Sequence, residues 1–130
     1  MSAYLLDTHT LLWLLLEPEL VPHTVRDDLA DPASRRYVSA ISAMEIATKA
    51  RVGKLPEGRA FLDTWPERLD ALAADELPLT ARHALVAGML PSDHRDPFDR
   101  MLAAQAIIEN VELVSNDPAM RTFPGLRVRW

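Results

Sequence analysis

Short apolar runs alternate with longer segments of helical periodicity along this chain. The runs predict strands or short extended pieces at residues 3–6, 37–41, 76–79, 111–114 and 126–129. Helical periodicity predicts helices at residues 8–16, 22–30, 42–52, 59–74, 80–90 and 96–109, with a helical turn opening at 117. Apolar strands that alternate with helices favour a parallel sheet covered on both faces. We therefore expect one three-layer α/β/α domain, with a central and mostly parallel sheet, over residues 1–130.

Local signals mark where several of these helices begin and end. Gly53 is placed as the C-terminal stop of the helix 42–52, and Pro66 is expected to break or kink the segment 59–74. Ser42 and Glu45 have the spacing of a capping box, in which Glu45 would reach back to the helix N-terminus. These signals predict short, tight connections, in agreement with ten prolines and only four glycines in the chain.

Composition excludes several classes of protein. The 130 residues are 48% hydrophobic and contain no cysteine, which excludes a disulfide scaffold and a cysteine-ligated zinc or iron–sulfur site. The longest apolar run, Leu11–Leu16, is far shorter than the ~20 residues of a membrane span. No Lys or Arg precedes Arg26, so the basic start of a signal peptide is also missing. We expect a protein of the cytoplasm without a membrane partner.

The charge distribution argues against one general mode of nucleic-acid binding. Fourteen basic and nineteen acidic residues give a net charge of −5, which does not suit a protein that wraps nucleic acid through bulk charge. Basic residues prevail over residues 35–59, and acidic residues prevail over residues 60–99. A basic face beside an acidic pocket that binds cations is compatible with this pattern.

Four acidic residues follow a strand or open a helix: Asp7, Glu45, Asp99 and Asp117. The carboxyl ends of the strands of an open parallel sheet meet at one edge, so acids distant in sequence can converge there. Each acid also has a simpler interpretation as helix punctuation, since Asp7 or Thr8 can cap one helix and Asp96-Pro97 opens another. Both interpretations stand for each residue taken alone.

The four acids together indicate a metal site. Carboxylates that share one crevice repel each other unless cations lie between them. Mg²⁺ and Mn²⁺ suit such all-oxygen sites, where they activate water and stabilise the leaving oxygen in phosphodiester hydrolysis. The spacing alone does not name the substrate.

The sequence resembles the PIN-domain ribonucleases, and specifically the VapC-like toxins of bacterial toxin–antitoxin pairs. The resemblance covers nearly the whole chain. Its anchors are Leu5-Leu6-Asp7-Thr8-His9-Thr10-Leu11-Leu12-Trp13, residues 38–49 with Gly53-Lys54-Leu55, His94-Arg95-Asp96-Pro97-Phe98-Asp99-Arg100 with its alanine-rich continuation to Ala106, and Leu113-Val114-Ser115-Asn116-Asp117. Four anchors in order at the family's spacing make the match specific.

The resemblance implies roles for individual residues. The metal ligands or catalytic acids would be Asp7, Glu45, Asp99 and Asp117. Residues that would support these acids or bind substrate are Asp96, Ser115, Thr8, Lys49 and Arg100. Many relatives have threonine where this chain has Ser115, and serine keeps the hydroxyl for a bond to phosphate or to an acid. For Lys49 the alternative is a simple ion pair with Glu45, four residues earlier.

The resemblance also implies an activity and partners. It implies an endoribonuclease that depends on Mg²⁺ or Mn²⁺, a homodimer, and a small VapB-like antitoxin whose C-terminal segment lies near the acidic cleft. The alternative within the family is a PIN fold that binds RNA or protein without cutting. Two other classes fit less well. A receiver-type phosphoacceptor domain needs a late lysine, and a phosphatase with an aspartate nucleophile needs an acid where His9 stands.

Overall fold

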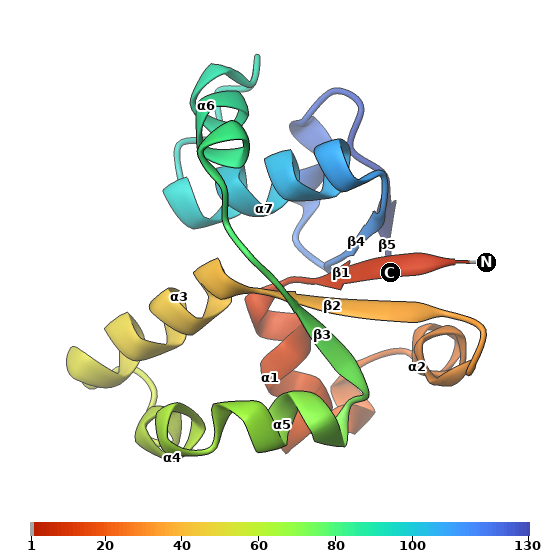
Figure 1. Cartoon of the computed structure of the whole chain (residues 1–130), viewed down its shortest axis with the longest axis vertical. Helices are drawn as coiled ribbons and strands as arrows, with labels where there is room; N and C mark the ends of the chain where they lie inside the picture. Colours follow the sequence, from red (N-terminus) through yellow and green to blue (C-terminus); the bar gives the residue numbers. More distant parts are fainter. Residues whose placement is uncertain (1) are drawn as a thin grey trace.

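The computed structural model describes residues 2–130 as an α/β domain built on one five-stranded sheet. All strand pairs are parallel, and the strand order is β3-β2-β1-β4-β5 (Figure 1). The strands are β1 Ala3–Leu6, β2 Arg35–Ser39, β3 Ala74–Leu77, β4 Glu112–Val114 and β5 Val128–Arg129. The predicted parallel α/β fold is therefore confirmed.

Helices cover both faces of this sheet. One side carries α1, α2, α4 and α5, and the opposite side carries α6 and α7 (Figure 1). The bounds are α1 Thr8–Leu16, α2 His23–Ala30, α3 Ala40–Arg51, α4 Gly58–Asp63, α5 Trp65–Ala71, α6 Ala81–Met89 and α7 Pro97–Glu109, with 3₁₀ turns η1 Pro18–Leu20 and η2 Pro118–Thr122. Among the described residues, no helix is long and apolar enough to cross a membrane.

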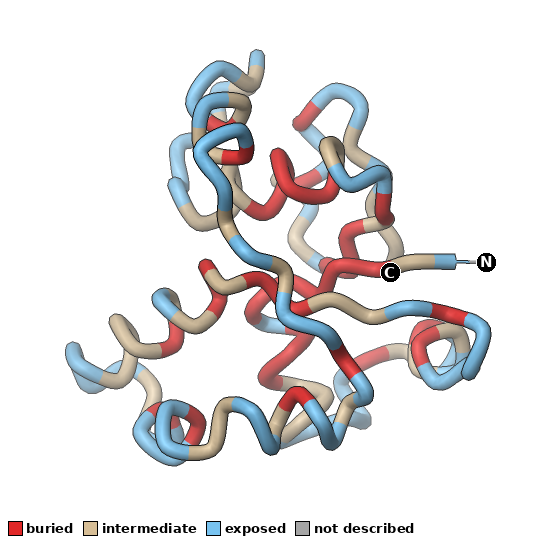
Figure 2. The backbone as a smooth tube through the Cα atoms, viewed as in Figure 1, coloured by how far each residue is buried: buried red, intermediate tan, exposed pale blue. Residues whose placement is uncertain are grey.

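Strand β1 lies between two hydrophobic cores, one on each face of the sheet. Successive side chains of a strand point to opposite faces of a sheet. Tyr4 and Leu6 accordingly pack with the helices of one face, and Leu5 packs with Leu102 and Ala103 of α7 on the other. Buried residues concentrate along this strand and the helix faces next to it (Figure 2). Burial on both sides explains why the strand is apolar throughout.

Most predicted elements are confirmed, with shifts at their ends. The first strand and the first helix have the predicted bounds, and the segment 59–74 is broken in two just before Pro66. Strand β2 begins two residues earlier than predicted, and β3 takes residues 74–77 instead of 76–79. These two strands pair with each other, from Arg36 with Ala74 to Ser39 with Leu77, and this long-range register determines their bounds.

The predicted capping box at Ser42 is wrong. Helix α3 begins at Ala40, and its N-cap is Ser39, whose hydroxyl accepts a hydrogen bond from the Ile41 amide at 3.0 Å. Ser42 is instead buried within the first turn of the helix and hydrogen-bonds Thr8 of α1. Glu45 consequently lies in the second turn, where its side chain is free for other partners.

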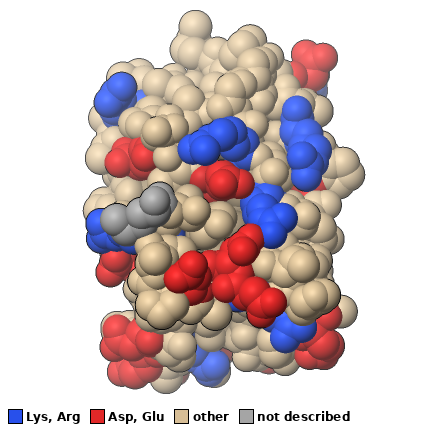
Figure 3. All heavy atoms as spheres, turned by 90° about the vertical axis from the view of Figure 1, so that its right-hand side faces the viewer, with Lys and Arg blue, Asp and Glu red and all other residues tan. Residues whose placement is uncertain are grey.

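The edge at which β1 begins carries charges of both signs. Figure 3 views the molecule from this side, and basic and acidic side chains are interspersed on the visible surface. One ion pair joins Arg35 and Asp75 near the starts of β2 and β3, at 3.4 Å. The acids of the predicted site lie elsewhere, because they follow the carboxyl ends of the strands or stand on the helices next to them.

Candidate active site

The direction in which the chain adds strands reverses between β1 and β4. The chain first builds outward from β1 through β2 to β3, and then returns to add β4 on the other side of β1. Ligands of open α/β sheets bind at such a reversal, outside the carboxyl ends of the strands. Asp7 directly follows β1 and Ser115 directly follows β4, and the Asp7 amide donates to the Val114 carbonyl across the two strands at 3.1 Å.

Asp7 is a buried carboxylate held by the start of α1. It is 7% exposed, and its Oδ1 accepts the Thr10 amide at 2.7 Å as the N-cap of the helix. Burial raises the pKa of Asp7 above its ordinary value, and hydrogen bonds from Ser115 and Thr10 and the nearby His9 partly offset this rise. The predicted capping role is confirmed, and the raised pKa marks a carboxylate that a cation would stabilise.

Ser115 links Asp7 with the last acid. The buried Ser115 hydroxyl contacts Asp7 and accepts the Asp117 amide at 3.1 Å. Asp117 caps the turn η2, where its Oδ1 accepts the Ala119 amide at 2.9 Å. The structure thus brings Asp7, Ser115 and Asp117 together at the ends of the two neighbouring strands.

A second group of acids lies at the start of α7. Asp99 stands in the first turn of this helix, and Asp96 caps the helix by accepting the Phe98 and Asp99 amides at 2.8 and 3.2 Å. The pKa of Asp99 is raised, chiefly by burial and further by the negative charges of Asp96 and Glu45, and hydrogen bonding to His94 partly offsets the rise. Asp99 and Glu45 are therefore electrostatic neighbours, although 54 positions separate them in sequence.

Glu45 reaches this group from α3. Its Oε2 lies 3.1 Å from the Lys49 ammonium, so the i,i+4 ion pair is confirmed. Both side chains are mostly buried, with 15% of Glu45 and 29% of Lys49 exposed. The lysine neutralises an acid that would otherwise repel Asp99 more strongly.

The donor set suits a hard divalent cation. It consists of carboxylates, which are the ligands that such cations prefer. Burial disfavours the charged forms of Asp7 and Asp99, and neighbouring negative charge further disfavours that of Asp99. With the side chains as they stand, no group of three or more His, Asp or Glu within residues 2–130 has the spacing of a metal site. Lys49 instead forms an ion pair with Glu45, and His94 lies within hydrogen-bonding distance of Asp99.

Comparison with known proteins identifies the family. The family model described as PIN domain matches residues 4–126. The chain belongs to the PIN domain family. No curated protein matches the sequence.

Solved structures share the fold of this PIN domain. A chain of VapBC2 from Rickettsia felis, bound to a DNA fragment from the promoter, aligns with a TM-score of 0.71 and 19% identity over 98% of each chain. A chain of VapBC-1 from nontypeable Haemophilus influenzae gives 0.69 and 16%, over 98% of this chain and 97% of that one. A toxin–antitoxin complex from Klebsiella pneumoniae gives 0.60 and 18%, over 98% and 96%. At these identities the likeness establishes the fold.

Two supporting residues of the PIN domain are engaged in structural contacts. The Thr8 hydroxyl lies 3.0 Å from that of Ser42 and so ties the start of α1 to α3. The Arg100 guanidinium donates to the carbonyls of Ala87, Leu90, Ser92 and His94 at 2.7–3.0 Å. Arg100 therefore anchors the connection between α6 and α7.

His94 is the residue that the sequence analysis missed. Its Nε2 lies 2.7 Å from Asp99 Oδ2, and its ring contacts Phe123 edge-on. Its position in the sequence could have indicated this contact. His94 stands two residues before the cap Asp96, so its side chain can fold back over the first turn of α7.

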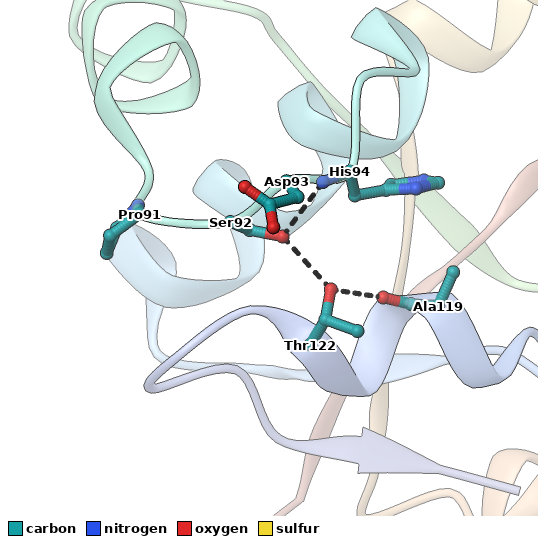
Figure 4. A pocket seen from close by; sticks show the side chains of 6 residues that line it. All are labelled: Pro91, Ser92, Asp93, His94, Ala119 and Thr122. Carbon is teal, nitrogen blue, oxygen red and sulfur yellow. Dashed lines mark hydrogen bonds between the residues drawn. The ribbon is translucent and has the colours of Figure 1, made fainter.

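A pocket of about 530 Å³ opens beside His94. It lies between the residues before α7 and the turn η2 (Figure 4). The Ser92 and Thr122 hydroxyls bridge its two walls at 3.0 Å, and the His94 amide donates to Ser92 at 3.2 Å. His94 thus lines this pocket and also contacts Asp99.

Proposed function

We propose that this PIN domain is a metal-dependent endoribonuclease, the toxin of a toxin–antitoxin pair. The observation that supports this most is the position of the acids. Asp7 and Asp117 follow neighbouring strands at the reversal point of the sheet, and Glu45 and Asp99 form the adjoining pair on α3 and α7. The raised pKa values of the Asp7 and Asp99 carboxyls are typical of a functional site.

The cation would be Mg²⁺ or Mn²⁺, held by Asp7, Asp99 and Asp117 with Glu45 in support. When bound, it supplies a Lewis acid that activates water and stabilises the leaving oxygen of a phosphodiester. The hydrogen bond from the Thr10 amide orients the Asp7 carboxylate, and His94 orients Asp99. Ser115 holds the Asp117 backbone and faces Asp7, so its hydroxyl is placed for substrate phosphate or for an acid.

The remaining supporting residues act around this centre. Asp96 fixes the first turn of α7, Thr8 links α1 to α3, and Lys49 balances the charge of Glu45. Lys49 is also the cation nearest to Glu45 that can exchange its partner for a substrate phosphate. Arg100 shapes the rim through the connection 90–96.

The partners follow from the structural neighbours. The aligned structures are VapBC and toxin–antitoxin complexes, which supports a small VapB-like antitoxin as partner. We further propose that the protein is a homodimer and that it acts in the cytoplasm. Its proposed substrate is RNA.

Cleavage of structured RNA tests the proposal. Purified, antitoxin-free protein is expected to cut in Mn²⁺ and not in EDTA. Asp7→Asn and Asp99→Asn should each reduce the rate by about a hundredfold or more, because a metal contributes several kcal/mol to such transition states. Asp27→Asn, on the exposed side of α2, is the matched control and should cut at the wild-type rate. Cutting that persists in both site variants contradicts the proposal.

A catalytically silent PIN domain is the second candidate. The observation in its favour is that Lys49 and His94 already hold Glu45 and Asp99. It predicts no metal-dependent cutting and no Mn²⁺ binding by calorimetry, whereas the nuclease predicts Mn²⁺ binding that Asp7→Asn removes.

A further inference from the structure

A second groove lies beside Lys49. It has a volume of about 530 Å³ and opens between α1 and the connection from α3 to α4. Lys49 belongs to both sites, because it lines the groove and pairs with Glu45 at 3.1 Å. His9, two residues after Asp7, lines the groove as well. The groove therefore adjoins the candidate active site through Lys49 and His9.

Aromatic rings form one wall of this groove. His9 is exposed and stacks on Trp13 one turn later, with ring centroids 5.8 Å apart and planes tilted by 34°. Trp13 is supported from behind by Trp130, also at 5.8 Å. A rigid aromatic pair that faces a cavity is the surface on which single-stranded bases stack.

The opposite wall offers both donors and acceptors. Lys54 and Glu57, on the connection after α3, provide an ammonium and a carboxylate, and Glu17 at the end of α1 provides a second carboxylate. Lys54 is fixed next to Lys49 by its own amide, which donates to the Lys49 carbonyl at 2.9 Å, after Gly53 turns the chain with a φ of 77°. Side chains of both charges suit the edge of a base, which presents amino donors and keto acceptors, better than they suit a phosphate alone.

The geometry points to a nucleotide subsite: this groove takes one unstacked nucleotide of the RNA strand, next to the scissile phosphate. The base stacks on His9 and Trp13, and Lys54 contacts its edge or its phosphate. The inference rests on the proposed function for its RNA strand, and it deepens that function by assigning residues that select the nucleotide.

Binding without cutting tests the subsite. The probes are four fluorescein-labelled tetraribonucleotides, of A, C, G and U, measured by anisotropy in EDTA at low salt. The wild type is expected to prefer one of them. His9→Ala should weaken that binding about tenfold, the effect of losing one stacked base, and His9→Phe should restore it to within about threefold. Lys54→Gln should weaken it about threefold to tenfold.

The matched control removes the same charge at a distant position. Arg82→Gln, exposed on α6, should bind within about twofold of the wild type. Equal binding by wild type, His9→Ala and Lys54→Gln would overturn the subsite, and so would an absence of binding to all four probes, which would leave the groove to a protein partner.

The outcomes separate the two proposals. His9-dependent binding without any metal-dependent cutting supports the subsite and contradicts the nuclease. Cutting that requires Asp7 and Asp99, with tetranucleotide binding indifferent to His9 and Lys54, supports the nuclease and contradicts the subsite.

Discussion

Asp7 combines a structural and a chemical role in one side chain. As an N-cap it stabilises α1 by accepting the Thr10 amide, which contributes about 1 kcal/mol in typical helices. As a buried carboxylate it is costly when ionised, and its pKa is raised for that reason. Asparagine keeps the acceptor and removes the charge, so substitution separates the two roles.

Asp7→Asn should therefore raise stability at neutral pH while it removes activity. A carboxyl whose folded pKa is raised destabilises the folded state above the unfolded value of 3.8, and this penalty grows as pH rises through the folded pKa. The gain of the variant should be present at pH 7 and vanish below about pH 3.8. Urea unfolding across this pH range measures it, with Asp27→Asn as the control. A variant less stable than wild type at pH 7 would contradict the burial argument.

At the scale of elements, the connection between α6 and α7 depends on one side chain. Arg100 lies in the first turn of α7 and donates to four carbonyls from Ala87 to His94. The other hydrogen bonds of this connection are those of Ser92 with Leu90, His94 and Thr122, that of His94 with Asp99, and those of the cap Asp96 at the start of α7. The connection carries His94, so its shape also positions Asp99.

Arg100→Gln should lower the free energy of unfolding by about 3 kcal/mol, because several charge-assisted hydrogen bonds are lost and their carbonyls are left without a partner. Arg95→Gln, at an exposed neighbouring position, should change it by no more than about 0.5 kcal/mol. Chemical denaturation measures both. An equal effect of the two substitutions would show that Arg100 does not anchor the connection.

Close packing between elements sets a further limit. Gly58 opens α4 against α3, and a Cβ there would lie 2.6 Å from the Cβ of Ala50. The two helices can approach only because this residue has no side chain. Lys54 and Glu57 lie in the connection just before this contact, and both line the groove beside α1.

At the scale of the whole molecule, the proposed site draws its acids from four separate parts of the chain. Asp7 and Asp117 come from the central strands, and Glu45 and Asp99 come from helices on either side of them. A cation bound by several of these residues would connect elements that unfold together. The melting temperature of the protein should therefore report whether a cation is bound at this site.

Mn²⁺ should raise the Tm of the wild type by about 5–10 °C at a hundred times its Kd, which corresponds to about 2.7 kcal/mol of linked binding free energy. Asp7→Asn and Asp99→Asn should lose this shift, whereas Asp27→Asn should keep it. Differential scanning calorimetry with and without EDTA measures the effect. A shift of the same size in both site variants would place the cation elsewhere.

Much of this architecture could be predicted because its signals are local. Asp96-Pro97 opens α7, Pro66 divides the segment 59–74, and Lys49 pairs with Glu45, each within one or two helical turns. The error at Ser42 has the same origin. Ser39 and Ser42 are both acceptable caps by local rules, and the pairing of β2 with β3 up to Ser39 decided between them.

The sequence by itself determined the order of strands and helices, the caps Asp7 and Asp96, and the four acids that follow strands or stand near helix starts. Periodicity and capping depend on neighbours along the chain, so they are legible without a structure. Only the tertiary structure decided which acids become neighbours, that His94 holds Asp99, that Arg100 serves the backbone, and that His9, Trp13 and Lys54 line one groove. These contacts arise from crossover connections and helix packing, which bring together residues that have no local relation in sequence.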